Sequence, residues 1–190
     1  MRIKAGITAS IVIALIIVFH LTASALDESQ ESVPDKVEWQ ELVSEEGGFT
    51  IMMPDTPTFN ISIQDTAVGD IEENAYSLKT KEAEYNVEYL DLPFIARIFG
   101  RKIIFKRAKT GLLKDEKGKE ISFVNIKQEG IRGAELVFET RKQRGKARFL
   151  LKREKLYVLI VTVSKKSDED EVMDKFLDSF KIIEKKRKPL

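Results

Sequence analysis

The stretch LYVLIVTV, from Leu156 to Val163, limits the possible folds of this 190-residue chain more than any other segment. Its residues are apolar at almost every position, so a strand built from them exposes apolar side chains on both faces. Such a strand lies in the middle of a sheet, because each face needs a covering layer. We therefore predict a layered fold with this strand at its centre.

Alternating apolar and polar residues predict further strands on both sides of this segment in the sequence. The short turns between them favour hairpins and an antiparallel sheet. We expect a turn at residues 130–133 and a break at Gly145. The predicted strands are residues 49–53, 59–63, 71–79, 85–89, 121–126, 134–139 and 147–152.

Two segments have helical spacing. Apolar residues three and four apart predict one long helix over residues 94–117, with a basic polar face and with weak points at Gly100 and Gly111. A second helix follows the central strand, and Ser167 is expected to cap it. Strand hairpins with few crossovers, covered by helices on one or both faces, give an α+β fold.

The glycine pair Gly47-Gly48 could suggest a phosphate-binding loop. Such loops lie between a strand and a helix. Here the pair precedes the predicted strand 49–53, and a second strand follows. We therefore interpret the pair as a turn that leads into the sheet.

The composition excludes several kinds of chemistry. The chain has no cysteine, and its single histidine is His20. Disulfides, thiolate metal sites and cysteine nucleophiles are therefore impossible, and the usual zinc ligands and histidine-based triads are missing from the body. The formal net charge is +1, which argues against general nucleic-acid binding. We expect no metal and no cofactor.

The first 25 residues have the layout of a secretory signal peptide. Two cations precede an apolar run over residues 5–21, and Ala23-Ser24-Ala25 matches a cleavage site. The alternative is an uncleaved membrane anchor through residues 5–21. We expect an exported protein, periplasmic or extracellular, with a flexible lead-in at 26–38, one globular domain at 39–184 and a basic tail at 185–190.

One cluster of cations could bind an anionic partner such as a lipid headgroup, a cell-wall polymer or an acidic protein. The alternation of a strand puts its members on one side of the sheet. The alternative is a solvated face neutralised by Glu135, Glu139 and Glu154. The candidate binding residues are Arg144, Lys146, Arg148 and Lys152.

Several motifs occur together: Trp39 shortly before GFTIMMPDTP, then AEYNVEYLDLP before the long helix, and KFLDSFKI near the end. In this combination the chain resembles a group of exported bacterial proteins of unassigned function that are related in fold to PsbP, the extrinsic subunit of photosystem II. The resemblance covers roughly Trp39 to Ile183. It implies an α/β/α sandwich with a central, mostly antiparallel sheet, and a noncatalytic accessory role.

Three functions remain compatible with these observations. The first is a noncatalytic exported binding or accessory module that docks a protein or an envelope component. The second is a carrier of a small apolar ligand between the sheet and the long helix, whose inner face is rich in Phe and Ile. The third is a hydrolase that uses a pair of carboxylates.

Overall fold

The structure is a computed structural model that describes residues 38–66, 69–94, 98–167 and 169–183. The predicted leader, the lead-in as far as residue 37 and the basic tail lie outside the described residues. No helix in the described part of the chain has the length and apolar character needed to cross a lipid bilayer.

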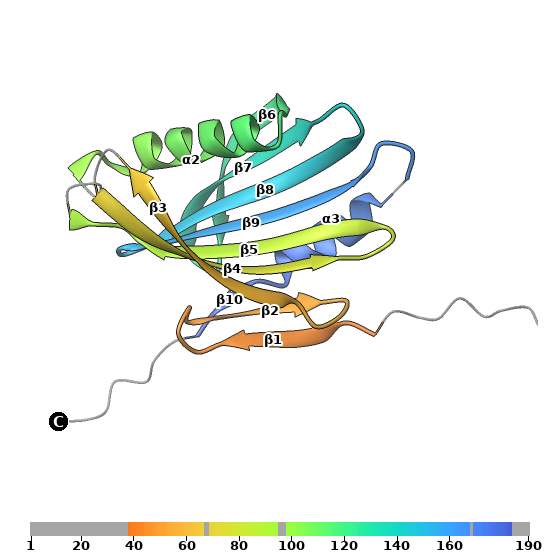
Figure 1. The fold of residues 1–190 in the computed structure, drawn as a ribbon, viewed down its shortest axis with the longest axis horizontal. Helices are drawn as coiled ribbons and strands as arrows, with labels where there is room; N and C mark the ends of the chain where they lie inside the picture. Colours follow the sequence, from red (N-terminus) through yellow and green to blue (C-terminus); the bar gives the residue numbers. More distant parts are fainter. Residues whose placement is uncertain (1–37, 67–68, 95–97, 168, 184–190) are drawn as a thin grey trace, which may run out of the picture. The chain divides into compact units, whose positions relative to one another are not determined.

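Seven antiparallel strands form the main sheet (Figure 1). The predicted central strand is confirmed, because β9 is fourth of seven and Leu159 and Val161 within it are fully buried. In spatial order the strands are β3 (Thr58–Thr66), β4 (Gly69–Lys79), β5 (Ala83–Asp91), β9 (Lys155–Ser164), β8 (Gln143–Lys152), β7 (Ile131–Glu139) and β6 (Lys119–Gln128).

A second, three-stranded antiparallel sheet consists of β1 (Gln40–Ser44), β2 (Phe49–Met53) and β10 (Lys181–Ile182). The sequence did not predict β1, whose residues QELVS lack a regular apolar alternation. The predicted turn at Gly47-Gly48 is confirmed: it joins β1 to β2, and Gly48 has a φ of 69°. The fully buried Phe49 and Ile51 of β2 pack into the main core.

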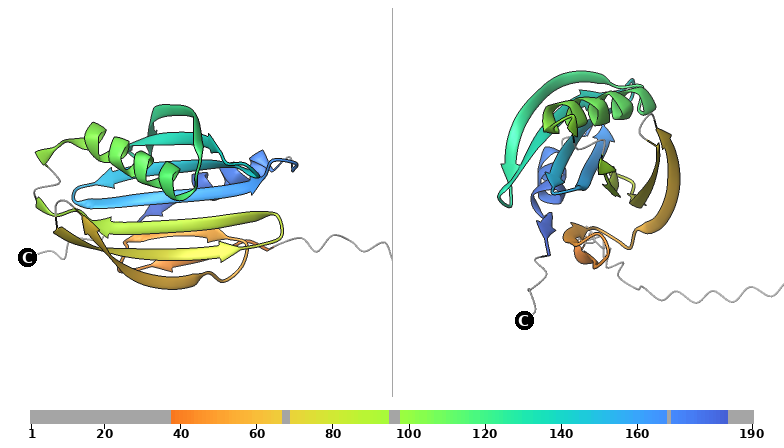
Figure 2. Two further views of the ribbon diagram at one scale, coloured as in Figure 1. Left: turned by 45° about the horizontal axis from the view of Figure 1, so that its top comes forward. Right: turned by 90° about the vertical axis from the view of Figure 1, so that its left-hand side faces the viewer.

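Helices cover both faces of the main sheet, as Figures 1 and 2 show. Helix α2 (Arg101–Asp115) packs on one face, which we call the α2 face, with Leu136, Phe149 and Val158 in its apolar cluster. Helix α3 (Asp170–Asp178) and the small sheet pack on the other, the α3 face. The predicted α+β fold with a central antiparallel sheet is confirmed.

The predicted long helix is interrupted at Gly100, one of its two predicted weak points. Phe94 and Ile98 are helical, Gly100 adopts a φ of 74°, outside the helical range, and α2 begins at Arg101. The second helix begins later than predicted. Ser167 does not cap α3. Its hydroxyl donates a hydrogen bond of 3.0 Å to the carbonyl oxygen of Ser164, and Glu169 occupies the N-cap position.

Two glycine assignments were wrong. Gly145 does not break the chain but lies buried inside β8, where a Cβ atom would be 2.5 Å from Cζ of Phe138. Gly133 lies inside β7, so the turn before that strand is confined to Glu129 and Gly130. Both glycines lie in strands where a neighbouring side chain approaches the backbone closely. From the sequence alone, a glycine in such a position cannot be distinguished from a glycine in a turn.

Candidate functional site

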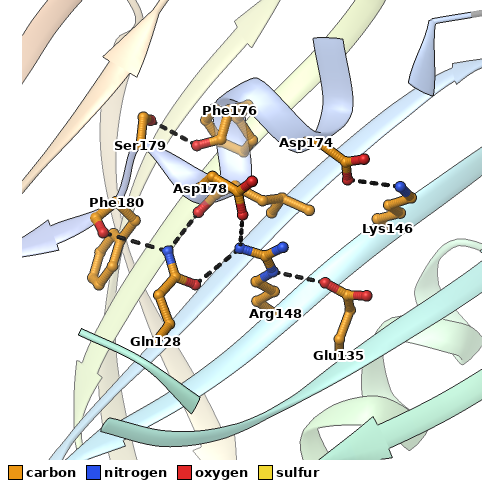
Figure 3. Close-up of polar contacts among 10 residues, drawn as sticks. Gln128, Glu135, Lys146, Arg148, Asp174, Phe176, Asp178, Ser179 and Phe180 are labelled. Atoms are coloured by element: carbon orange, nitrogen blue, oxygen red, sulfur yellow. Dashed lines mark hydrogen bonds and ion pairs between the residues drawn. The ribbon is translucent and has the colours of Figure 1, made fainter. Parts of the chain in front are cut away.

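Three of the four cations predicted to bind an anionic partner form ion pairs inside the chain. They lie on the α3 face of β8, and each contacts an aspartate of α3 (Figure 3 shows two of these pairs). The pairs are Arg144–Asp170 at 3.0 Å, Lys146–Asp174 at 2.7 Å and Arg148–Asp178 at 2.6 Å.

Arg148 has further partners besides its aspartate. Besides Asp178, its guanidinium donates to Glu135 at 2.7 Å and to the side-chain oxygen of Gln128 at 3.1 Å. The Gln128 amide donates in turn to the carbonyl oxygen of Leu177 at 2.7 Å, at the end of α3. It also donates to the carbonyl oxygen of Phe180 at 3.3 Å (Figure 3). Hydrogen bonds from Arg148 to Glu135 and Asp178 raise the pKa of its guanidinium in spite of burial.

These contacts give the predicted cations a role within the fold. Lys152 lies at the far end of β8, beyond the row of ion pairs, next to the turn into β9. Among the glutamates expected to neutralise the cluster, Glu135 contacts Arg148 and Glu139 contacts Lys165. The aspartates of α3 balance much of the charge of Arg144, Lys146 and Arg148, and binding of an anionic partner by these cations stays a prediction.

A cavity of about 680 Å³ lies between α2 and the α2 face of the sheet. We call it the α2 cavity. Its floor comes from β4, β5 and β9, and its roof from α2 and the residues just before it. Most of its surface is apolar. The apolar lining residues are Ile71, Leu90, Leu92, Phe99, Ile103, Ile104, Ala108, Leu112, Leu156, Val158 and Ile160.

Strand alternation in β5 builds the floor. Tyr85, Val87 and Tyr89 point to the α3 face, where they are almost completely buried in the core. The residues between them therefore point into the cavity, and they include Asn86 and Glu88.

The roof follows from helical spacing. Ile104, Ala108 and Leu112 are four residues apart and lie on the sheet-facing side of α2, where each lines the cavity. Gly111 also lines it and has no neighbouring atom within 4 Å of where a Cβ would lie. A small side chain at 108 and none at 111 leave the space between helix and sheet open.

One end of the cavity is acidic. Glu73 of β4 and Glu88 of β5 point into it from the sheet, and Asp115 and Glu116 from the end of α2. Burial first, and then the nearby Glu73, raise the pKa of Glu88 to about 8, although a hydrogen bond of 2.5 Å that Asn86 donates to Glu88 lowers it. Glu88 is therefore mostly protonated at pH 7.

The pKa of Glu73 is raised too, mainly by burial and also by Asp115, while a hydrogen bond from Ser62 lowers it. Burial first, and then Glu84 and Asp115, raise the pKa of Glu116. Arg107 and Gln64 complete the polar lining. In the described part of the chain, no group of three or more His, Cys, Asp or Glu side chains is arranged to hold a metal ion.

The sequence indicated the position of this site but not its chemistry. A ligand space between the sheet and the long helix was one of its three hypotheses, and the cavity lies there. Glu73 and Glu88 were not predicted, because their strands are separated by a turn and alternation alone does not tell which face a helix covers. The segment AEYNVEYLD did contain a signal for Glu88. Its glutamates alternate with the tyrosines, so they point to the face of the strand opposite to the aromatic side chains.

Comparison with known proteins supports the fold. No family model matches the chain, and no curated protein matches its sequence. The solution structure of cyanobacterial PsbP from Synechocystis sp. PCC 6803 superposes with a TM-score of 0.55 at 11% identity, over 77% of this chain and 93% of that one. The predicted PsbP-like fold is therefore confirmed.

A crystal structure of a protein of unknown function from Pseudomonas aeruginosa is also similar. It covers 63% of this chain and 95% of its own, with a TM-score of 0.41 and 10% identity. At that level the likeness carries no argument, and at 11% identity the likeness to PsbP concerns the fold alone.

Proposed function

We propose that this chain is a noncatalytic binding module that carries a small, mainly apolar molecule in the α2 cavity. The observation that supports the proposal is the cavity itself, an apolar space of about 680 Å³ with a few polar groups at one end. Small-molecule sites in proteins are typically concave, mostly apolar and roughly 300–1,000 Å³ in volume. The leader predicted from the sequence adds that the module acts outside the cytoplasm.

The polar groups of the cavity favour one class of ligand. Four carboxyl groups and one guanidinium, that of Arg107, line it. An anionic ligand would meet a like charge at the acidic end, whereas a hydrogen-bond donor or a cation there would be attracted. We therefore propose a ligand with an apolar body and one donor or cationic group, which lies near Glu88.

Three probes with the same alkyl chain test this proposal: 1-decylamine, 1-decanol and decanoate. Binding is measured by isothermal titration calorimetry on the exported form of the chain, after native mass spectrometry has identified any ligand that copurifies. The amine is expected to bind most tightly and decanoate most weakly. If none of the three binds and no small molecule copurifies, the carrier function is wrong.

A matched pair of variants locates the binding. Ala108→Trp places an indole in the cavity, whereas Thr110→Trp adds the same group to an exposed position of α2 that does not line it. We expect Ala108→Trp to abolish decylamine binding and Thr110→Trp to leave it unchanged, with the circular dichroism of both like that of the wild type. Equal binding by all three proteins would contradict the proposed site.

A second candidate function is carboxylate-based hydrolysis. The observation in its favour is the raised pKa of Glu88, because a general acid needs to hold a proton near neutral pH. Asp115, from the roof of the same cavity, would be the second carboxyl group. Turnover of glycan or ester substrates that Glu88→Gln abolishes, with decylamine binding retained, would favour this function over a carrier.

A further inference from the structure

Four large apolar side chains are exposed where the chain leaves β5 and enters α2. Their exposed fractions are 71% for Phe94, 68% for Ile98, 41% for Phe99 and 44% for Ile103. We call these four residues the apolar tip. They lie within ten residues of one another in sequence, at the end of the sheet where α2 begins (Figure 1). A cluster of this kind on a soluble domain marks an interaction surface.

The segment that carries the apolar tip and most of α2 is rich in cations. Residues 92–114 contain seven Lys and Arg and no Asp or Glu. Because the whole chain carries +1, this leaves −6 for the rest. Arg101, Lys102, Lys106 and Arg107 of α2 are exposed, and the Arg107 guanidinium lies 5.0 Å from the centre of the Phe99 ring. Apolar and cationic side chains are therefore intermixed.

We propose that the apolar tip docks on the surface of an anionic lipid bilayer. Exposed Phe and Ile side chains enter the boundary between headgroups and acyl chains, while adjacent Lys and Arg side chains contact lipid phosphates. The charge favours this occupant over an apolar protein surface, because four cations around four apolar residues would be buried without compensation in a dry protein interface.

Docking in this way would also place the α2 cavity next to the bilayer surface. Phe99 and Ile103 belong to the apolar tip and line the cavity as well. An apolar ligand could therefore pass between bilayer and cavity with little exposure to water. The docking proposal does not depend on the carrier function, because it is tested with vesicles and without ligand.

The lack of cysteine in the chain allows a clean local test. Ile98→Cys in the apolar tip and Val124→Cys on β6 each receive an environment-sensitive fluorophore. Val124 is the control because it is also exposed, at 50%, but lies on the far edge strand of the sheet. Each fluorophore reports only on its own surroundings. The predicted leader can therefore remain on the chain, because membrane binding by the leader would not by itself change the signal at residue 98 or 124.

Vesicles of phosphatidylcholine with and without 30 mol% phosphatidylglycerol serve as the probe. We expect a blue shift, and quenching by nitroxide lipids, for the label at 98 with anionic vesicles only. The label at 124 should not respond. An equal response at both positions, no response at 98, or an equal response to neutral vesicles would overturn the proposal.

Charge reversal separates the tip from general electrostatic attraction. Arg101→Glu with Lys102→Glu should weaken vesicle binding by at least about tenfold, since each cation near an anionic surface contributes about 1 kcal/mol. Arg141→Glu with Lys142→Glu, at an exposed turn between β7 and β8, is the matched control and should weaken it clearly less. Equal losses in the two double variants would contradict a docking site at the apolar tip, as would binding of an acidic protein in place of vesicles.

Discussion

Arg148 of β8 and Asp178 of α3, thirty residues apart in sequence, form an ion pair at 2.6 Å. The pair is the last of a row of three in which the strand advances by two residues and the helix by four. Two strand residues span about 6.7 Å and four helical residues about 6 Å, so the two repeats stay in step over this length. The row aligns α3 along the sheet.

Removing the guanidinium of Arg148 should destabilise the fold. In Arg148→Met the apolar stem is kept, but Glu135 and Asp178 lose their cation, and the side-chain oxygen of Gln128 loses a donor. We expect a loss of about 1–3 kcal/mol in the free energy of unfolding, because these groups are only partly solvated. Urea denaturation measures it.

The exposed Arg141 supplies the control for that experiment. Arg141→Met should change the free energy of unfolding by less than about 0.5 kcal/mol. If Arg148→Met proves no more harmful than this control, the row of ion pairs does not hold α3 in place.

Stability should fall as the pH rises through the range where Glu88 ionises. Its pKa is about 8 in the folded protein and about 4.5 when unfolded, so the folded state binds the proton more tightly. The resulting penalty is absent below pH 4.5, grows between pH 4.5 and 8, and is constant above that. Glu88→Gln should remove it, so that the variant gains about 1–3 kcal/mol on the wild type between pH 5 and pH 9.

Urea denaturation at pH 5 and pH 9 provides the test for Glu88. Glu41→Gln, at an exposed position of β1, serves as the control and should keep the pH dependence of the wild type. A Glu88→Gln variant whose stability follows the same pH curve as the wild type would show that burial does not hold the proton on Glu88.

Decylamine binding should become tighter as the pH rises, whereas the stability of the fold should fall. The ammonium group pairs with the ionised form of Glu88. Because the pKa of Glu88 is about 8, the carboxyl group is mainly protonated at lower pH and has to lose its proton before the pair forms. The affinity should therefore rise from pH 6 to pH 8, by up to about tenfold for each pH unit. Decanol should not gain, and Glu88→Gln should flatten the decylamine curve. Calorimetry at several pH values measures both, and a flat curve for the wild type would place the amine away from Glu88.

Two glycines should respond to alanine in opposite directions. In Gly145→Ala the new methyl group would lie 2.5 Å from the Phe138 ring, so we expect a loss of about 1–3 kcal/mol. In Gly111→Ala the methyl group meets no atom within 4 Å, and alanine favours a helix by up to about 1 kcal/mol over glycine. Thermal denaturation of both variants tests whether Gly145 is required by that close approach, which a tolerated Gly145→Ala would refute.

The sequence predicts the two faces of β5 better than it predicts the ion pairs of β8. The alternation in AEYNVEYLDLP is enough to place Tyr85 and Glu88 on opposite faces of a strand. The counterion of Arg144 could not be predicted, because Asp170 is equally well explained as a charge near a helix start. Only the packing of α3 on β8 distinguishes the two roles. The counterion of Lys146, Asp174, could not be predicted because the sequence does not show which strand α3 covers.

The sequence by itself determined the strands of the main sheet, the central position of Leu156–Val163 and the absence of cysteine and histidine chemistry in the body. These properties depend on local periodicity and on composition, which need no knowledge of distant contacts. Only the tertiary structure decided that the cations of β8 are paired, that Gly145 lies inside a strand, and that a partly acidic cavity separates α2 from the sheet. Each of these depends on which segments meet in space, and that is set by the packing of whole layers against one another.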